Sequence, residues 1–299
     1  SFEWANLNAT QKALLNIDPD TSTVDALGDE RVLFLRGDRS CELQNRDSVA
    51  ACTTSGAAFR DRGSRLGDLV NSSPAYVGAP QFGYPDWLER YEDTSNPSTQ
   101  TNLSAERYSE FKSDEDGRTP MLYVGGNDGM LHGFTASPNA SGGVERIAFV
   151  PNAVYSTLNQ LTSPDYAHRY FVDGTPTFGD VLFSTDNSWH TILVGGLNGG
   201  GRGIYALDVT DPSFTAPNAA FLWELETTTA LGSDFYDLGY TYSRPSIVKN
   251  HSGVNAFNYV NTEGKWVVIF GNGYASAAGK AVLYIVDART GTLVDSVVA

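Results

Sequence analysis

Three stretches of this sequence repeat one pattern, and the repeat constrains the fold more than any other feature. They are MLYVGGNDGMLHGFTA at 121–136, TILVGGLNGGGRGIYALDV at 191–209 and WVVIFGNGYASAAGKAVLYIVDA at 266–288. Each runs from an apolar stretch through a turn rich in Gly or Asn into a second apolar stretch, which is typical of a β-hairpin. When the second strands are aligned, His132 falls at the position of Tyr205 and Tyr284.

The residues on either side extend each hairpin to about four strands. An extended run with a central proline precedes each hairpin (Pro74, Pro176 and Pro245), and a further apolar run follows it. Four strands are the content of one β-propeller blade. We therefore predict an all-β fold, a partial β-propeller of four-stranded antiparallel blades with quinoprotein-like repeats, preceded by a short helical segment within residues 1–64. The blades are expected at 65–155, 168–226 and 238–299.

Three blades are fewer than the four to eight that typically close a propeller, so we expect a fragment of a larger one. The start of the sequence, SFEWANLNAT, likewise reads as the middle of a longer chain and not as a signal peptide. Between neighbouring blades we expect aromatic side chains, among them Tyr205 and Tyr284, to fill the space.

The first copy of the repeat also has the look of a catalytic or phosphate-binding stretch. It places several glycines, an acid and one of only four histidines close together. A phosphate loop is disfavoured, because no Gly-Lys-Ser/Thr follows and no helical pattern begins. We assign the glycines to tight turns. We interpret His132 as a strand residue in an aromatic position, with a catalytic role as the alternative.

The composition excludes some classes of partner. A formal net charge of -15 over 299 residues disfavours nucleic acid, because the phosphate backbone would be repelled. The same charge is compatible with calcium, which takes oxygen ligands. No apolar run is long enough to span a bilayer, so no transmembrane segment is predicted in this chain.

Two insertions interrupt the repeat. The first, residues 83–120, is polar and contains scattered aromatic side chains at Trp87, Tyr91, Tyr108 and Phe111. Long loops on propellers often carry binding sites, but a solvated ornament is an equal alternative here. The second, residues 151–170, contains a short helical pattern and His168, and we interpret it as a packed connection between blades.

The segment before the blades carries a candidate calcium loop. Residues 6–17 have the apolar spacing of a short helix, with Thr10 as a candidate cap. Oxygen-bearing side chains then alternate at Asp18, Asp20 and Ser22, Val24 can offer its carbonyl, and Asp25 follows. A calcium loop surrounds its ion in this way. Pro19 and the lack of a closing Glu favour the alternative, a solvated turn.

The tripeptide Arg36-Gly37-Asp38 follows in RVLFLRGDRS, which we expect to form a strand. One interpretation is a cell-adhesion ligand, in which a flexible glycine presents opposite charges to a receptor. The other is structural, with Arg36 and Asp38 forming a buried or capping ion pair at the strand end.

The only two cysteines are Cys41 and Cys52, in a polar segment. Their spacing does not match common zinc sites, and no histidine lies nearby. A local disulfide is the preferred interpretation and would indicate an oxidising compartment. Two free thiols are the alternative.

Several stretches, in this order, resemble one protein family. They are LRGDRS, FRDRGSRLGDLVNSSPAYVGAP, MLYVGGNDGMLHGF, YFVDGTPTFGDV and LVGGLNGGGRGIYALDVTDP. Together they look like the C-terminal propeller region of the PilY family, which are type IV pilus biogenesis factors that act as pilus-tip adhesins. The resemblance runs from about Leu7 to the end of the chain.

This resemblance implies a calcium-responsive protein without catalytic activity, at the pilus tip or bacterial cell surface, which it would reach through the periplasm. It implies minor pilins and a host or abiotic surface receptor as partners, and a role in pilus extension, surface attachment and twitching motility. Two family features are missing: the Asp-rich calcium loop of a later blade and the N-terminal von Willebrand A-like domain. If calcium ordered the loop from Asp18 to Asp25, it would help to present Arg36-Gly37-Asp38.

Two other classes of function stay open. A quinoprotein dehydrogenase dependent on pyrroloquinoline quinone has propeller blades with a similar GIYALDV pattern. Such an enzyme needs a carboxylate base, cation ligands and stacking residues over the central channel, and usually adjacent cysteines. The two cysteines here are not adjacent, and no sequence feature gathers the other groups. The third class is an inert structural scaffold within a larger assembly.

Overall fold

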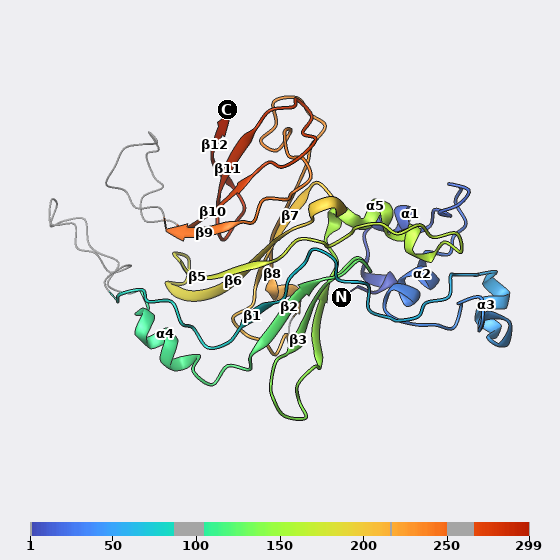
Figure 1. Cartoon of the computed structure of the whole chain (residues 1–299), viewed down its shortest axis with the longest axis horizontal. Coiled ribbons are helices and arrows are strands. Elements are labelled where there is room, and N and C mark those ends of the chain that lie inside the picture. Colours follow the sequence, from blue (N-terminus) through green and yellow to red (C-terminus); the bar gives the residue numbers. More distant parts are fainter. Residues whose placement is uncertain (1, 87–104, 216, 250–265, 299) are drawn as a thin grey trace.

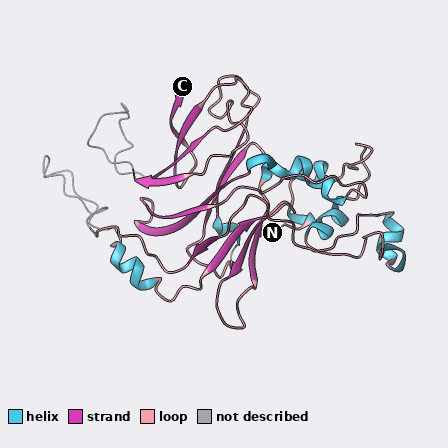
Figure 2. Ribbon diagram, in the orientation of Figure 1, coloured by secondary structure: helices cyan, strands magenta, loops and turns pink. Residues whose placement is uncertain are grey.

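The computed structural model describes residues 2–86, 105–215, 217–249 and 266–298. Three four-stranded antiparallel sheets form most of this part of the chain (Figures 1 and 2). In Figure 1 they follow one another in chain order, from the first sheet at the bottom to the third at the top. The helices of the N-terminal segment gather at one end of the molecule.

Each sheet takes its strands in sequence order. The first contains β1 (Ala75–Val77), β2 (Met121–Gly125), β3 (Leu131–Thr135) and β4 (Glu145–Phe149). The second contains β5 (Thr177–Phe183), β6 (Ser188–Gly196), β7 (Gly203–Asp208) and β8 (Phe221–Glu226). The third contains β9 (Ser246–Lys249), β10 (Trp266–Gly271), β11 (Val282–Asp287) and β12 (Leu293–Val298). The three repeated hairpins are β2–β3, β6–β7 and β10–β11, so the prediction of four-stranded antiparallel blades is confirmed.

The helices are short. The α-helices are α1 (Ala9–Leu15), α2 (Gly28–Leu35), α3 (Ala50–Ser55), α4 (Tyr108–Asp114) and α5 (Tyr155–Leu158). Single 3-10 turns cover Trp4–Asn6, Arg46–Ser48, Asn152–Val154, Asn159–Thr162, Asn198–Gly200 and Pro217–Ala220. Helix α1 is capped by Asn8 and not by Thr10. The Asn8 side chain accepts a hydrogen bond from the Gln11 amide at 2.9 Å, and the Gln11 side chain accepts one from the Asn8 amide.

The predicted strand before Arg36 is wrong, because these residues form helix α2. Its buried positions include Gly28, Arg31, Val32 and Leu35, which recur at the three- and four-residue spacing of a helix face. Arg31 belongs to the buried face because its guanidinium is paired with Asp25. A charged residue in this position hid the helical period, and the run of apolar residues after it looked like a strand.

The first insertion is docked onto the protein wherever the structure describes it. In helix α4, Tyr108 and Phe111 are buried, and the Tyr108 hydroxyl donates a hydrogen bond to Asp180 of β5 at 2.7 Å. Tyr84 stacks on Trp189 of β6, with ring centroids 5.5 Å apart. These described parts are therefore core elements and not an ornament, whereas Trp87 and Tyr91 lie outside the described residues. The second insertion forms α5 and its flanking turns and is packed into the core, as predicted.

The repeated glycine at the end of the second strand brings neighbouring sheets together. Gly125, Gly196 and Gly271 occupy equivalent register positions, opposite Leu131, Ile204 and Leu283 respectively. A Cβ on Gly125 would lie 2.1 Å from the Val172 carbonyl oxygen, and one on Gly196 would lie 2.6 Å from that of Thr241. Both carbonyls belong to the segment that leads into the next sheet. Close backbone approach, and not turn geometry, therefore requires glycine at positions 125 and 196, whereas a Cβ on Gly271 would meet nothing closer than 3.6 Å.

The aromatic position of the repeat is buried in all three sheets. His132, Tyr205 and Tyr284 are each at most 5% exposed. Tyr205 packs against Phe149 of the first sheet, with ring centroids 5.2 Å apart, so it lies between two sheets as predicted. The ring partners of Tyr284 are Phe270 of its own sheet and Phe235 of the segment that leads into that sheet.

We expect Tyr205→Phe to leave stability unchanged or to raise it by up to about 1 kcal/mol. The Tyr205 hydroxyl is buried without a hydrogen-bond partner, so removing it relieves a desolvation penalty. Tyr108→Phe is the matched control, because the buried Tyr108 hydroxyl donates a hydrogen bond to Asp180 at 2.7 Å. That variant should lose about 1 kcal/mol. Urea unfolding of both variants measures the difference, and equal losses would contradict the assignment.

Candidate functional site

The N-terminal segment packs against the end of the first sheet and holds every site residue predicted from the sequence. Its core residues Leu15, Val32 and Leu35 belong to the same hydrophobic cluster as Leu131 of β3 and Leu158 of α5. Two hollows lie between this segment and the first sheet, with volumes of about 610 and 350 Å³. This region is the candidate site.

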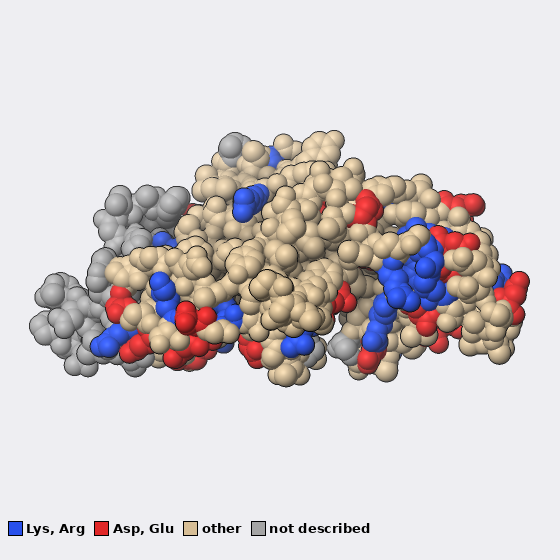
Figure 3. Space-filling model, turned by 60° about the horizontal axis from the view of Figure 1, so that its bottom comes forward, with Lys and Arg blue, Asp and Glu red and all other residues tan. Residues whose placement is uncertain are grey.

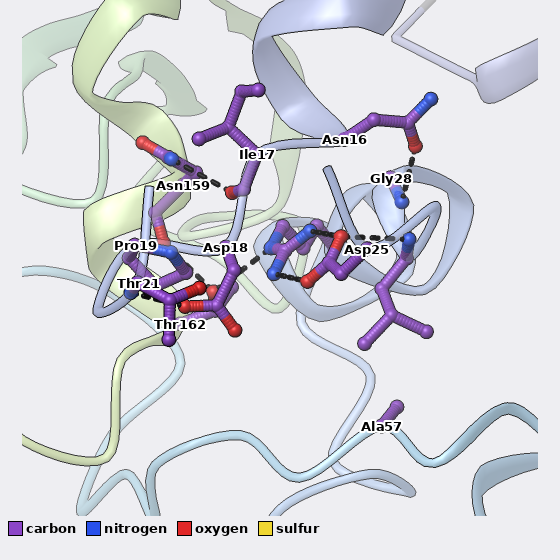
Figure 4. Close-up of polar contacts among 12 residues, drawn as sticks. Asn16, Ile17, Asp18, Pro19, Thr21, Asp25, Gly28, Ala57, Asn159 and Thr162 are labelled. Carbon is purple, nitrogen blue, oxygen red and sulfur yellow. Dashed lines mark hydrogen bonds and ion pairs between the residues drawn. The ribbon is translucent and has the colours of Figure 1, made fainter. Parts of the chain in front are cut away.

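The loop predicted to bind calcium joins α1 to α2 and is held by its own hydrogen bonds (Figure 4). One carboxylate oxygen of Asp18 accepts the backbone N–H groups of Asp20 at 2.9 Å and Thr21 at 2.7 Å. The hydrogen bond from Thr21 is the main reason that the pKa of Asp18 is lowered. The Asp25 carboxylate accepts hydrogen bonds from both terminal nitrogens of the buried Arg31 guanidinium.

The other three predicted ligands lie in different surroundings. Asp20 accepts the Ser163 hydroxyl at 2.5 Å, Val24 is exposed, and Ser22 has a positive φ of 58°. In the described part of the chain, no three side chains of His, Cys, Asp or Glu come together as a metal site. As arranged here, the set therefore does not fit a calcium ion, since Asp25 would have to leave Arg31. Calcium binding by this loop stays a prediction.

The Arg36-Gly37-Asp38 tripeptide ends helix α2. The Gly37 amide donates to the Phe34 carbonyl at 2.8 Å, and the Asp38 amide donates to the Leu33 carbonyl at 2.9 Å. With Gly37 at a φ of 99°, these two bonds are the Schellman arrangement that closes helices. The tripeptide therefore has a structural function in its backbone.

The side chains of the tripeptide are exposed. The Arg36 guanidinium is 45% exposed and lies 3.3 Å from the Glu3 carboxylate, while Asp38 accepts the Ser40 amide at 2.6 Å. Arg36 and Asp38 do not pair with each other, so the predicted capping ion pair is not formed. Receptor binding by these side chains stays a prediction.

A buried ion pair that sequence reasoning missed holds the chain after α2. Arg62 donates to Glu42 at 2.8 Å and to the Phe34 carbonyl at 2.6 Å, and also bonds the Asp38 carbonyl. The second Glu42 oxygen accepts from Arg39 at 2.9 Å. Burial by itself raises the pKa of Glu42, but hydrogen bonds from Arg62, Gln44 and Arg39 outweigh it and lower that pKa. The closely spaced arginines of FRDRGSR, residues 59–65, were the sequence feature that could have indicated this ion pair.

The predicted disulfide is confirmed. Cys41 and Cys52 are bonded, with their Cα atoms 5.3 Å apart. The bond joins the stretch after the tripeptide to the short helix α3, and the Cys52 side chain is buried. It closes a small loop beside the Arg62–Glu42 pair.

His132 is held between two carboxylates. Its Nε2 lies 3.0 Å from Asp128 and its Nδ1 lies 2.6 Å from Glu145. Burial alone lowers the pKa of His132, but the hydrogen bonds and charges of the two carboxylates outweigh it and raise that pKa to about 9. The ring is therefore charged at neutral pH and donates from both nitrogens, which leaves it no free lone pair to act as a general base.

Comparison with known proteins identifies the family of a chain with this fold. A family model of the PilY1 beta-propeller domain matches residues 66–298. The chain belongs to the PilY1 family. The match begins at the end of the N-terminal segment and covers all three sheets.

Among the PilY1 relatives, the type IV pilus biogenesis factor PilY1 of Pseudomonas aeruginosa strain PAK is 40% identical over 296 residues. That alignment covers 98% of this chain and 21% of the relative. A PilY1 homolog of Xylella fastidiosa strain Temecula1 is 37% identical over 270 residues, covering 90% of this chain and 16% of the relative. The chain thus spans about a fifth of the length of the curated relatives it matches.

A solved structure supports the same assignment. The crystal structure of the Pseudomonas aeruginosa PilY1 C-terminal domain is similar to this chain, with 35% identity and a TM-score of 0.52. The aligned region covers 75% of this chain and 37% of the crystallised chain. Among the described residues, no helix combines the length and apolar character that crossing a membrane requires.

Proposed function

We propose that this chain is the propeller portion of a type IV pilus biogenesis factor and acts there as a binding module without catalytic activity. The observation that carries the proposal is the match of residues 66–298 to the PilY1 propeller. The relatives named as pilus biogenesis factors align over nearly all of this chain, which includes the N-terminal segment.

The proposal extends to the pilus tip, where the chain would work with minor pilins and support attachment and twitching motility. The Cys41–Cys52 disulfide supports passage through the periplasm, because such bonds persist in oxidising compartments. The exposed side chains of Arg36 and Asp38 support contact with a host or abiotic surface receptor.

The test uses the bacterium that carries the full-length protein. Deletion of its gene should remove most surface pili and twitching, and a full-length copy with wild-type residues should restore both. Sheared surface pilin and colony spreading measure the two effects. Normal piliation and twitching in the deletion strain would overturn the proposal.

A quinoprotein dehydrogenase is the runner-up. Dye-linked oxidation of alcohols in the presence of pyrroloquinoline quinone and calcium would favour this enzyme over a binding module. An inert scaffold is the remaining alternative, and it predicts normal attachment by every surface variant.

The tripeptide prediction can be tested with Asp38→Glu. If the tripeptide is a receptor ligand, binding of the purified chain to epithelial cells should fall at least about tenfold, because the carboxylate is displaced by one methylene. The melting temperature should hardly change, since the helix is closed by the Asp38 backbone. Asp47→Glu is the matched control, with an exposed carboxylate outside the tripeptide. A lower melting temperature with unchanged binding would mean that the motif is only structural.

Calcium responsiveness gives a second measurable expectation. If the loop binds calcium, saturation at about 100 times the Kd should stabilise the chain by about 2.7 kcal/mol. The resulting rise in melting temperature, about 4 °C, should disappear in the Asp18→Asn, Asp20→Asn double variant and persist in Asp47→Asn. An equal melting temperature with and without calcium would contradict binding by this loop.

A further inference from the structure

Two adjoining hollows form one groove between the N-terminal segment and the first sheet. Leu35, Arg65, Leu66 and Asp128 line both of them. Together they have the volume of sites that hold several side chains or a small ligand. Figure 3 shows Lys and Arg side chains gathered over this end of the molecule, although the chain as a whole is acidic.

The lining of the groove contains more arginines than carboxylates. It includes the arginines Arg36, Arg60, Arg62, Arg65 and Arg146 and the carboxylates Asp68, Asp128 and Glu145. All three carboxylates are engaged by histidine: Asp128 and Glu145 by His132, and Asp68 by His168 at 2.8 Å. Each acidic side chain of the groove therefore has a hydrogen-bond partner, and the arginines outnumber the carboxylates five to three.

Three of these guanidinium groups have no carboxylate partner among the described residues. Arg60 donates to the Leu161 carbonyl and lies 4.2 Å from the centre of the Tyr166 ring. Arg65 is exposed and donates its Nε to the Gly37 carbonyl at 2.9 Å. Arg146 is exposed on β4. Burial lowers the pKa of Arg60, so this cation lies partly out of water with no carboxylate of the described residues within salt-bridge distance.

The walls between these charges are apolar. Phe34, Leu35 and Leu161 line the smaller hollow, and Met130, Phe134 and Ile147 line the larger one. Strand β4 borders the larger hollow and pairs only with β3, so within the described chain its other edge is open. An open edge beside side-chain pockets is the arrangement that takes up an extended peptide.

We propose that this groove binds an extended acidic segment of a partner protein, in which carboxylates alternate with apolar side chains. The guanidinium groups of Arg60, Arg65 and Arg146 would take the carboxylates, since their planar donors match a carboxylate in pairs. The apolar walls of the groove would contact the apolar side chains that lie between the carboxylates of the partner segment. The surrounding acidic surface repels such a segment elsewhere and directs it to the groove.

The proposal gives the Arg36-Gly37-Asp38 tripeptide a second role. Gly37 closes α2, and its carbonyl fixes the Arg65 side chain, while Arg36 lines the larger hollow. In this role the tripeptide is part of a receptor and not a ligand. The inference does not depend on the proposed pilus function, because it concerns binding by the isolated chain.

The test is fluorescence anisotropy of the full 299-residue chain with a fluorescein-labelled nine-residue peptide in which Asp and Glu alternate with Leu. A second peptide with Asn and Gln in place of the acids is the matched ligand control. The acidic peptide should bind and the neutral peptide should not. The Arg65→Gln, Arg146→Gln double variant should bind the acidic peptide at least about tenfold more weakly, which is a loss of about 1.4 kcal/mol.

The control variant is Arg244→Gln, because Arg244 is an exposed arginine that lines a different hollow. Its affinity for the acidic peptide should stay within about twofold of that of the wild type. The single variant Arg146→Gln is included because the Arg146 side chain has no partner among the described residues. Its replacement should therefore not disturb folding, so weaker binding by this variant reports on the groove. Equal binding of both peptides, or an unchanged affinity in the double variant, would overturn the proposal. So would binding of a heparin fragment without binding of the acidic peptide, which would indicate an anionic polysaccharide ligand.

Discussion

Gly125→Ala should destabilise the chain by about 3 kcal/mol or more. The added Cβ would lie 2.1 Å from the Val172 carbonyl oxygen, and both atoms belong to backbone, which cannot rotate away as a side chain does. The first and second sheets would have to move apart, which would also weaken the hydrogen bond from the Val172 amide to the Gly126 carbonyl. Thermal unfolding should show a melting temperature lower by about 5 °C or more.

The repeat supplies its own control for this prediction. Gly271 holds the equivalent position in the third sheet, but a Cβ there would meet nothing closer than Ser243 at 3.6 Å. Gly271→Ala should therefore change stability by less than about 1 kcal/mol. Equal losses in the two variants would mean that the intrinsic strand propensity of glycine, and not the contact between sheets, decides the effect.

Glu42→Gln should cost about 3–5 kcal/mol, because among the described residues Glu42 is the one carboxylate that pairs with the buried Arg62. The Glu42 side chain is fully buried and that of Arg62 is 6% exposed, so water cannot replace the lost partner. The Arg39 side chain loses the same counterion. Urea unfolding measures the loss, and a difference below about 1 kcal/mol would show that the pair is not important for stability.

The exposed pair Glu3–Arg36 is the matched control. Both side chains are nearly half exposed, and Glu3→Gln should change stability by less than about 1 kcal/mol. A Glu42→Leu, Arg62→Met double variant should recover part of the loss, because it removes both charges together. Recovery would show that the unpaired cation, and not the altered shape, causes the loss.

Acid should reduce the difference between wild type and Glu42→Gln. The pKa of Glu42 is lower in the folded chain than its ordinary value near 4.5. A group with a depressed folded pKa contributes its stability above the unfolded pKa and loses it as the pH falls through the folded pKa. The two proteins should therefore differ fully at neutral pH and converge below about pH 4.

The sequence alone was sufficient to identify the three sheets. Each hairpin is local, so its two apolar strands and its turn lie within one short stretch, and their alternation follows from side chains facing opposite sides of a strand. The repeat added the register, because it placed His132, Tyr205 and Tyr284 at one position, where all three are buried. The disulfide was also predictable, since Cys41 and Cys52 are close in sequence.

The candidate site depended on contacts between residues far apart in the chain. Arg62 reaches Glu42 across 20 positions, and Asn159 donates to the Ile17 carbonyl across 142 positions. A local pattern such as the basic residues of FRDRGSR does not identify the distant partner that each residue contacts. Helix α2 was mistaken for a strand for the same reason, because its buried Arg31 counts as part of the apolar face only once Asp25 is seen beside it.

The sequence by itself therefore determined the three repeated hairpins and the family, and it favoured the disulfide over free thiols, because all of these depend on short-range patterns. Tertiary structure decided what those patterns are used for. It made the Gly125 position a contact between sheets and made the Arg36-Gly37-Asp38 tripeptide a helix end. It also gathered Arg36, Arg146 of β4 and the arginines of residues 60–65 into one groove. The physical reason is that burial, ion pairing and close backbone approach belong to neighbours in space, which the chain brings together only when it folds.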